Sequence, residues 1–196
     1  MKTKSRSIDL QIETAQLQEE LNRVKHKARS KFVLRNTVFI LVVVAAVAIL
    51  VATLLLPVLQ IYGSSMAPTL NNGEIVVSVK SSDFKTGDIC AFYYNNKILV
   101  KRVIAGPGDW VDIDKDGTVY VNDVKKDEPY LAEKALGDCD IKLPYQVPDD
   151  KFFVMGDHRS VSMDSRNSSI GPISQELIVG KIVFRVWPLG DMGGLK

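Results

Sequence analysis

Two side chains in the sequence have the chemistry for nucleophilic attack on a carbonyl group: the hydroxyl of Ser65 and the amine of Lys101. A serine hydroxyl is a weak nucleophile until a nearby base takes its proton. A lysine can act as that base where apolar surroundings hold its amine neutral. Lys101 lies in such a run, at positions 99–104, in which Arg102 is the only other charged residue. Since serine–lysine pairs are a known form of the serine–base arrangement, we predict Ser65 as nucleophile and Lys101 as general base.

Two other residues compete for these roles on composition alone. Ser64 is an alternative nucleophile, and only the spacing to Pro68 favours Ser65. His158 is an alternative base, because histidine is the commonest general base in enzymes. It lies, however, in a charged, glycine-containing turn. A serine near glycine and proline is often only a turn residue, so the residue types by themselves leave these alternatives open.

A membrane-length apolar stretch precedes the serine. No residue from Thr37 to Leu59 is charged, and about 20 apolar residues are enough for one helix to cross the hydrocarbon layer. The apolar part of a cleaved signal peptide is typically only about 7–15 residues long and follows a short charged start, whereas here charged residues extend over the first 35 positions. A buried soluble helix is rarely so long and so uniformly apolar. The stretch therefore predicts one transmembrane helix over 37–59.

The charges on the two sides of this stretch predict its orientation. The segment before it is rich in lysine and arginine, and the segment after it, from Gln60 to Asn72, has neither. Basic residues are enriched on the cytoplasmic side of a transmembrane helix. We therefore expect residues 1–36 to be a basic cytoplasmic arm and residues 60–196 to be extracellular. The basic residues nearest the stretch are Arg23, Lys25, Lys27, Arg29, Lys31 and Arg35.

The basic arm has a weak helical pattern. Leu10, Leu17, Leu21 and Val24 fall near helical spacing, which predicts a short helix. We expect this helix to lie on lipid headgroups. A coiled coil with another chain is the alternative, but the arm holds fewer than the about 3–4 heptads that such an assignment needs.

The segment from Ile61 to Trp187 has the pattern of one mainly β domain. Short runs rich in β-branched and aromatic residues alternate with turn signals such as Lys115-Asp116-Gly117, which is typical of antiparallel hairpins. We predict an extracellular catalytic domain built from an antiparallel, barrel-like β-sheet. Residues 127–150 are polar and contain three prolines, so they should form an extended excursion from the sheet. The expected strands are 74–79, 88–94, 97–103, 110–114, 118–122, 152–155 and 181–187.

The composition indicates which classes of partner and cofactor are not expected. The formal net charge is +2, which indicates no nucleic-acid partner. The chain has two histidines and two cysteines without a Cys-x-x-Cys spacing, so no metal and no other cofactor is expected. Cys90 and Cys139 follow the apolar stretch, on the side where disulfides persist. The sequence leaves open whether they are bridged or whether Cys90 is a core side chain and Cys139 is free, and it indicates no oligomeric state.

Four blocks of residues, in order, resemble the type I signal peptidases, membrane-bound serine proteases that remove signal peptides from exported proteins. The blocks are 65–70, 87–89, 101–109 and 155–166, and the similarity extends over 37–189. The resemblance implies that Ser65 is the nucleophile and that Lys101 is the general base. It also implies that Ser162 supplies a hydroxyl that orients the lysine. The residues that match the family's supporting acid-and-arginine network are Asp157, Asp164 and Arg166.

Arg102 follows the lysine in an expected strand, where neighbouring side chains point to opposite faces. It should therefore point away from the reaction and form an ion pair with an acid such as Asp157 or Asp164. We expect Asp157, Asp164 and Arg166 to brace the site rather than take part in the chemistry.

Two positions depart from the family pattern. His158 stands where the family usually has asparagine, and Gly63 stands where many bacterial members have a serine whose hydroxyl helps bind the oxyanion. Losing one such donor can cost about 10²–10³ in rate when nothing replaces it. We expect backbone N–H groups, chiefly that of Ser65, to bind the oxyanion. Glycine at this position is also common among Gram-positive members, so it does not indicate an inactive enzyme.

The resemblance implies an endopeptidase that removes signal peptides at the outer face of the cytoplasmic membrane. Cleavage is expected after small residues, with the substrate extended along the sheet edge near Lys101. The expected partners are signal-peptide-bearing preproteins and the lipid bilayer. The alternatives are an inactive, membrane-anchored assembly factor of the same fold and a self-cleaving regulator. The presence of both Ser65 and Lys101 argues against the first, and the lack of a DNA-binding helix pair before the anchor argues against the second.

Overall fold

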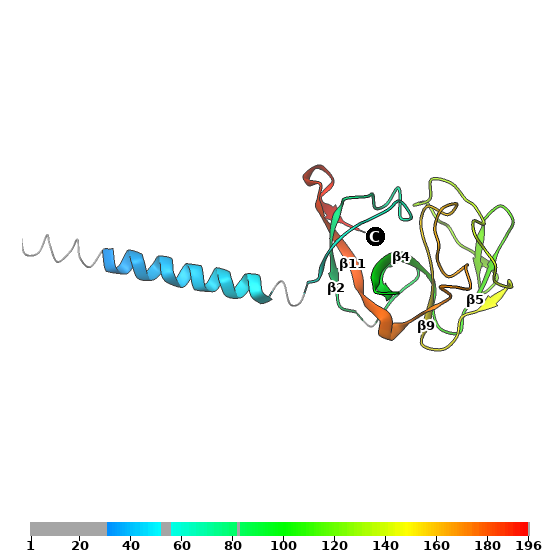
Figure 1. Cartoon of the computed structure of the whole chain (residues 1–196), viewed down its shortest axis with the longest axis horizontal. Helices are drawn as coiled ribbons and strands as arrows, with labels where there is room; N and C mark the ends of the chain where they lie inside the picture. Colours follow the sequence, from blue (N-terminus) through cyan, green and yellow to red (C-terminus); the bar gives the residue numbers. More distant parts are fainter. Residues whose placement is uncertain (1–30, 52–55, 82, 196) are drawn as a thin grey trace, which may run out of the picture. The chain divides into compact units, whose positions relative to one another are not determined.

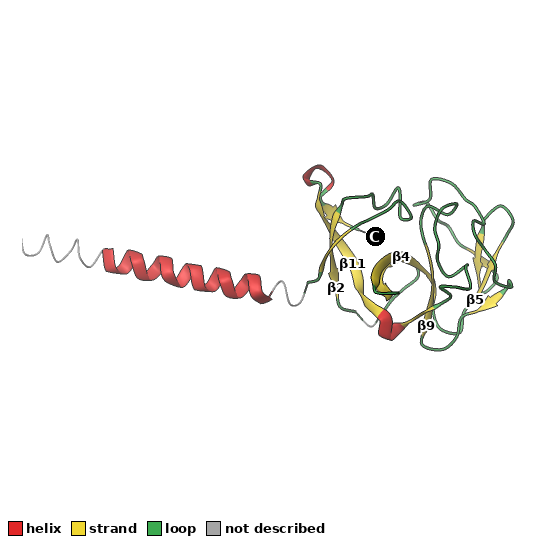
Figure 2. Ribbon diagram, viewed as in Figure 1, coloured by secondary structure: helices red, strands yellow, loops and turns green. Residues whose placement is uncertain are grey.

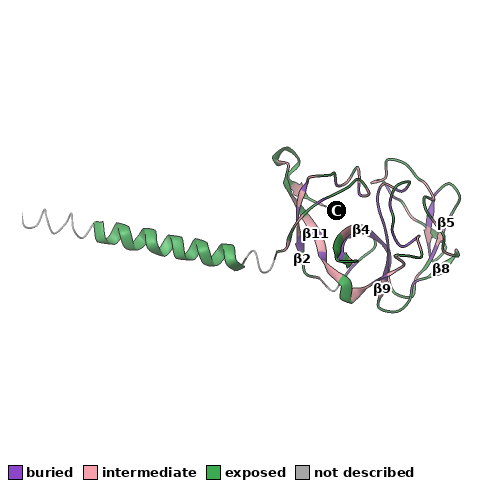
Figure 3. Ribbon diagram, viewed as in Figure 1, coloured by how far each residue is buried: buried purple, intermediate pink, exposed green. Residues whose placement is uncertain are grey.

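The computed structural model describes residues 31–51, 56–81 and 83–195, and it divides the chain into two compact units, Met1–Ala52 and Thr53–Lys196. In the first unit, Lys31–Val51 forms one helix that is long and apolar enough to cross a membrane. Figure 3 shows this helix exposed along its length. A helix that is apolar all round and not covered by protein is typical of a membrane span. Of the predicted basic arm, residues 1–30 lie outside the described residues.

The boundary between the helix and the β domain differs from the prediction. The transmembrane helix was expected to run to Leu59, but Val58–Gln60 forms strand β1, and the second unit begins at Thr53. Pro57 precedes β1, and proline disrupts a helix because it lacks an N–H and clashes with the preceding turn. Leu59 packs against a buried cluster of the β domain. Leu59, at the end of the apolar stretch, therefore belongs to the β domain rather than to the helix.

The second unit is mainly β, as predicted (Figure 2). Each strand expected from the sequence is present, with its ends shifted by at most three residues. The described strands are β1 Val58–Gln60, β2 Ile75–Val79, β3 Ile89–Tyr94, β4 Lys97–Ala105, β5 Trp110–Ile113, β6 Val119–Val121, β7 Val124–Lys125, β8 Tyr145–Gln146, β9 Lys151–Met155, β10 Ile173–Ser174, β11 Ile178–Trp187 and β12 Gly193–Gly194. Two short 3-10 helices, η1 Gln175–Leu177 and η2 Leu189–Asp191, flank β11.

The strands form two antiparallel sheets. The larger sheet has the order β1-β2-β11-β3-β4-β9-β10, with β12 paired to β11, and the smaller has the order β7-β6-β5-β8. Figure 1 shows β4 between β11 and β9 in the middle of this domain. The excursion predicted for 127–150 contributes only β8 to a sheet, and the rest of it has no regular structure.

Strand β4 runs from the surface into the core. Its first two residues are exposed, and the five residues from Lys101 to Ala105 are buried. Ile104 belongs to an apolar cluster shared with the smaller sheet, and Val103 belongs to one shared with β3 and β9. The amine of Lys101 is therefore carried at the point where the strand enters the apolar interior.

The two cysteines are not bridged. Cys90 lies in β3 opposite Lys101, and burial raises the pKa of its thiol to about 12. Cys139 is half-buried in the excursion. Of the two arrangements that the sequence left open, the structure has the one in which Cys90 is a small core side chain and Cys139 is free.

Candidate active site

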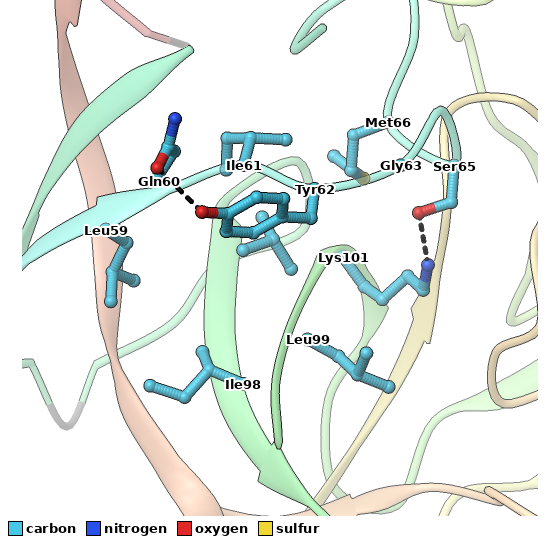
Figure 4. A pocket seen from close by; sticks show the side chains of 11 residues that line it. Leu59, Gln60, Ile61, Tyr62, Gly63, Ser65, Met66, Ile98, Leu99 and Lys101 are labelled. Atoms are coloured by element: carbon cyan, nitrogen blue, oxygen red, sulfur yellow. Dashed lines mark hydrogen bonds between the residues drawn. The ribbon is translucent and has the colours of Figure 1, made fainter. Parts of the chain in front are cut away.

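Ser65 and Lys101 come together where β4 enters the core. Lys101 Nζ donates a hydrogen bond of 2.6 Å to Ser65 Oγ. Figure 4 shows the two side chains pointing toward one another from different segments. Lys101 is 3% exposed, and Ser65 is half-buried. The two residues singled out from the sequence thus form a hydrogen-bonded pair although 36 positions separate them.

Apolar side chains hold the turn that carries the serine, residues 63–70, which we call the serine turn. Met66 and Leu70 are buried in a cluster that also contains Val76 of β2 and Ile182 of β11. The Leu70 N–H donates to the Met66 carbonyl over 2.8 Å. Because these anchors follow Ser65 closely, core packing fixes the backbone of the serine while its hydroxyl stays at the cavity.

The block 155–166 begins at the last residue of β9 and contacts the backbone of the serine. We call it the closing block. The His158 N–H donates to the Ser65 carbonyl over 3.0 Å. Gly156 packs directly against the same carbonyl and against the Ser162 side chain, so that a Cβ atom at this position would overlap both. A residue without a Cβ is required where two segments approach this closely. The closing block therefore limits where Ser65 can lie.

Arg102 joins four segments around the site. It forms a bidentate ion pair with Asp157, with hydrogen bonds of 2.9 Å from Nε and 2.6 Å from Nη2. Nη1 donates to the Gly87 carbonyl over 2.6 Å, and Nη2 contacts Thr69 Oγ1 at 3.3 Å. The predicted ion pair is present, with Asp157 as the partner. It connects β4 to the closing block, the turn before β3 and the serine turn.

Asp164 and Arg166 form a second buried bidentate pair. Both hydrogen bonds, from Nε to Oδ1 and from Nη2 to Oδ2, measure 2.8 Å. Asp164 Oδ2 also accepts the Gly156 N–H over 2.9 Å. Burial by itself raises the pKa of Asp164, but the hydrogen bonds and charge of Arg166, together with other hydrogen-bond donors such as the Gly156 N–H, outweigh burial, and the net pKa is lowered. The pair holds the closing block in the shape that contacts Ser65.

The sequence reasoning missed a third part of the site, residues 127–143, which we call the strap. Glu128 of the strap forms a buried ion pair with Arg159, at 2.5 Å between Oε1 and Nη2. The Arg102 guanidinium stacks on the ring of Tyr130, and Arg102 Cζ lies 3.9 Å from the centroid of this ring. The Leu136 carbonyl accepts a 2.6 Å hydrogen bond from Arg166. The strap therefore contacts all three buried arginines around the site.

A partial signal for these contacts exists in the sequence. Arg159 lies inside the closing block, and a charged residue in a buried block requires a partner of opposite charge. Glu128 lies 31 positions earlier, in a segment without strand or helix periodicity. Nothing in the sequence selects this glutamate among the other acids of the excursion.

Burial lowers the pKa of Lys101 from 10.5 to about 8. Asp164 and Asp157 act against burial by favouring the charged amine, and Arg166 acts with it. An amine with a pKa of about 8 is neutral in roughly a tenth of molecules at pH 7 and in about half at pH 8. The site therefore contains an amine that can accept a proton near neutral pH.

The remaining candidate residues are placed as follows. Ser162 Oγ is buried without a hydrogen-bond partner, so the structure lacks the expected hydrogen bond to Lys101, and the orienting role of Ser162 stays a prediction. His158 contacts Ser65 through its backbone, and its Nδ1 has no partner. Ser64 is exposed, and Lys101 donates to Ser65. Within the described residues, no group of three or more His, Cys, Asp and Glu side chains is placed to hold a metal ion.

A cavity of about 100 Å³ opens beside the pair (Figure 4). Residues of 59–66 and 98–101 line it, and most of these side chains are apolar. Strand β3 pairs with β4 along Lys97–Arg102, whereas β9 pairs with β4 only from Arg102 onward. The other edge of β4 over 97–101 therefore has backbone groups available to an extended peptide.

The Ser65 N–H is an available donor at this cavity, since it donates no hydrogen bond to any described residue. The Gly63 N–H donates instead to Asn72 Oδ1, over 2.9 Å. Gly63 has φ +93°, a left-handed conformation that disfavours residues with a Cβ. A serine at this position would be strained in this backbone, whereas glycine is not.

Comparison with known proteins identifies the family of this chain. Residues 34–187 match the family model described as signal peptidase, peptidase S26. The chain belongs to the signal peptidase family. It is therefore a serine endopeptidase whose family removes signal peptides, and the resemblance stated from the sequence is confirmed. Membership and the apolar helix together indicate a membrane-anchored enzyme.

The relatives include well-covered bacterial enzymes. Signal peptidase I of Bacillus amyloliquefaciens is 37% identical over 183 residues, which cover 88% of this chain and 98% of that protein. Signal peptidase IB of Staphylococcus aureus is 40% identical over 151 residues, which cover 67% of this chain and 78% of that protein. A crystal structure of a signal peptidase I from Enterococcus faecalis is 30% identical, with a TM-score of 0.44, and covers 50% of this chain and 96% of that chain.

Replacing Gly156 with alanine tests whether the closing block positions the serine. The new Cβ overlaps the Ser65 carbonyl and the Ser162 side chain, so one of the two segments must shift. A shift of about 1 Å near a reacting group can cost about 10²-fold in rate. We expect kcat for preprotein cleavage to fall by about 10²-fold, with a much smaller change in KM.

Gly171→Ala is the matched control for this variant. Unlike Gly156, Gly171 has a left-handed φ, of +62°, but nothing lies within 4 Å of the position of its Cβ. It should lose some stability and keep its activity. A folded Gly156→Ala enzyme with wild-type kcat would show that the contact does not position Ser65.

The lowered pKa of Lys101 makes a prediction about stability. Folding lowers this pKa from 10.5 to about 8, which corresponds to about 3 kcal/mol of destabilisation wherever the amine is protonated. This destabilisation is present in full below pH 8. It disappears as the pH rises to 10.5, because the unfolded state then also loses the proton.

Lys101→Met should therefore be inactive and more stable than the wild type at pH 7. We expect the free energy of unfolding to rise by about 2 kcal/mol. The variant loses the destabilisation of about 3 kcal/mol, but it also loses a hydrogen bond to Ser65 that contributes about 1 kcal/mol. The gain should shrink as the pH rises above 8. Urea unfolding of both detergent-solubilised proteins across this range measures it, and a variant less stable than the wild type at pH 7 would contradict the burial argument.

Proposed function

We propose that this enzyme cleaves signal peptides from preproteins with a Ser65–Lys101 dyad, after small residues and at the outer face of the cytoplasmic membrane. The observation that carries the proposal is the 2.6 Å hydrogen bond between Lys101 Nζ and Ser65 Oγ at a buried position. The lowered pKa of Lys101 supports it, because only a neutral amine can accept the serine proton.

In the acylation step, neutral Lys101 accepts the hydroxyl proton while Ser65 Oγ attacks the scissile carbonyl. The tetrahedral intermediate collapses to an ester on Ser65, and the Lys101 ammonium donates its proton to the departing amine of the mature protein. A water molecule then attacks the ester, with Lys101 again accepting a proton. The signal peptide is released as a carboxylic acid, and Ser65 regains its proton.

The oxyanion of the intermediate would be bound by backbone N–H groups. The Ser65 N–H supports this role, because it lies at the cavity without an acceptor among the described residues. Such donors stabilise negative charge most when they are fixed before the reaction. The core anchors of the serine turn, Met66 and Leu70, provide this fixation.

The substrate would bind as an added strand along the free edge of β4. Backbone hydrogen bonds to 97–101 would hold the residues before the scissile bond. Side chains of an extended peptide alternate between faces, so every second side chain would enter the apolar cavity. The cavity is small, about 100 Å³, which supports cleavage after small residues.

The charge pattern supports the location. Basic residues precede the apolar helix and are absent from 60–72, which favours a cytoplasmic N-terminus and an external β domain. Ser65 follows the helix within a short length of chain. A preprotein that is still tethered by its own apolar segment at the same membrane would therefore be within reach of the site.

The dyad is tested by the pH dependence of cleavage. Wild-type kcat/KM should rise with pH along one limb centred near pH 8, because the neutral amine is the active form and the pKa of Lys101 is about 8. Lys101→Arg carries a charge that cannot be lost in this range, so it should be inactive at every pH. Ser65→Ala and the double variant should be equally inactive, since the pair acts as a unit.

Ser64→Ala is the control, because it removes an exposed neighbouring hydroxyl and should keep the wild-type profile. Circular dichroism establishes that each variant is folded. If folded Lys101→Arg cleaves preproteins at a useful rate, the general base is a different residue.

The orientation is tested by protease accessibility. Protease added to intact cells should digest the β domain, from residue 61 onward, and spare residues 1–31, because the β domain is proposed to be external. In inverted vesicles the pattern should reverse. A β domain that is protected in intact cells and cleaved in inverted vesicles would show the opposite orientation.

A further inference from the structure

A second cavity, of about 350 Å³, lies beside the serine turn and shares no lining residue with the first. Three segments described above meet here: the serine turn, the closing block and the strap. The lining residues are Ala67, Pro68, Ala132, Glu133, Asp157 and His158.

Glu133 gives this cavity its charge. Asp157 also lines it, but Arg102 neutralises that carboxylate through the bidentate pair, and Thr69 donates to it. Glu133 is exposed, and its Oε1 accepts a 3.0 Å hydrogen bond from Ser160. Within the described residues no lysine or arginine forms an ion pair with Glu133. A ligand in the cavity would therefore meet one uncompensated negative charge.

Ser65 lines the first cavity, and residues that adjoin Ser65 line the second. In Figure 4 the first cavity extends from Leu59 at one end to Ser65 at the other. Ala67, a wall of the second cavity, follows Ser65 by two positions, and the His158 N–H donates to the Ser65 carbonyl. The second cavity is therefore the one lined by residues on the C-terminal side of Ser65 and by the block that binds its carbonyl.

We infer, on the basis of the proposed function, that the second cavity receives the first residues of the mature protein, which are those that follow the scissile bond. The first cavity is lined by residues of 98–101, on the free edge of β4, and suits the end of the signal peptide. The second has small side chains on its walls and more than three times the volume. Glu133 makes it favour basic over acidic side chains in the mature protein.

The expected preference is modest. An ion pair at an exposed carboxylate changes affinity by about two- to fivefold, and salt reduces it further. We expect substrates with lysine at the position that reaches Glu133 to have about threefold higher kcat/KM than those with glutamate. At positions that do not reach the cavity, the ratio should be near one.

The experiment uses the full-length enzyme in detergent with preproteins that differ only in the mature part. Lysine, glutamine or glutamate is placed at each of the first four mature positions in turn, and kcat/KM is measured. In Glu133→Gln the lysine-to-glutamate ratio should fall to about one, and in Glu133→Lys it should invert. Glu176→Gln removes an exposed carboxylate in η1 that lines neither cavity, and it should keep the wild-type ratio.

Two results would overturn the inference. A ratio that is unchanged in Glu133→Lys would show that mature residues do not enter the cavity. A ratio that changes equally at all four positions would show a long-range effect of charge rather than a site. Failure of the dyad mechanism gives a different result, because Ser65→Ala would then still cleave every substrate in the series.

Discussion

The site depends on keeping one lysine amine largely out of water beside a serine hydroxyl. Burial disfavours the charged amine, but Asp157 and Asp164 lie close enough to favour it. Each of these acids is engaged by an arginine in a buried bidentate pair, Arg102 in one case and Arg166 in the other. Because the arginines compensate the two carboxylates, burial dominates and the pKa of Lys101 falls. The ion pairs therefore affect the pKa of Lys101 without forming a direct contact with its amine.

The arginines in turn depend on the strap. A buried guanidinium needs partners for all of its donors, and a carboxylate alone does not supply them. The Leu136 carbonyl takes a donor of Arg166, the ring of Tyr130 covers Arg102, and Glu128 neutralises Arg159. A segment without regular secondary structure thus completes the electrostatics of a site whose reacting groups lie elsewhere in the chain.

The sequence was sufficient for the features that have local patterns. The strands follow from alternating residues and turn signals, and the pairing of Ser65 with Lys101 was expected from the blocks that contain them. The end of the apolar helix was predicted wrongly, because Leu59 is equally apolar in a membrane and in the core that it joins after Pro57. The partnership of Glu128 with Arg159 could not be predicted, since side-chain pairing between distant irregular segments leaves no periodic signal.

The position of the Ser65 hydroxyl and the protonation state of Lys101 are controlled by different parts of the structure. Apolar packing of Met66 and the contact of Gly156 with the Ser65 carbonyl fix where the hydroxyl lies. Burial and the compensated acids set the charge of Lys101. Buried ion pairs add little net stability because desolvation offsets their attraction, so the apolar clusters must supply the stability that the charged network does not. The polar residues around the dyad are thus best understood as determinants of geometry and pKa, supported by a core that is separate from them.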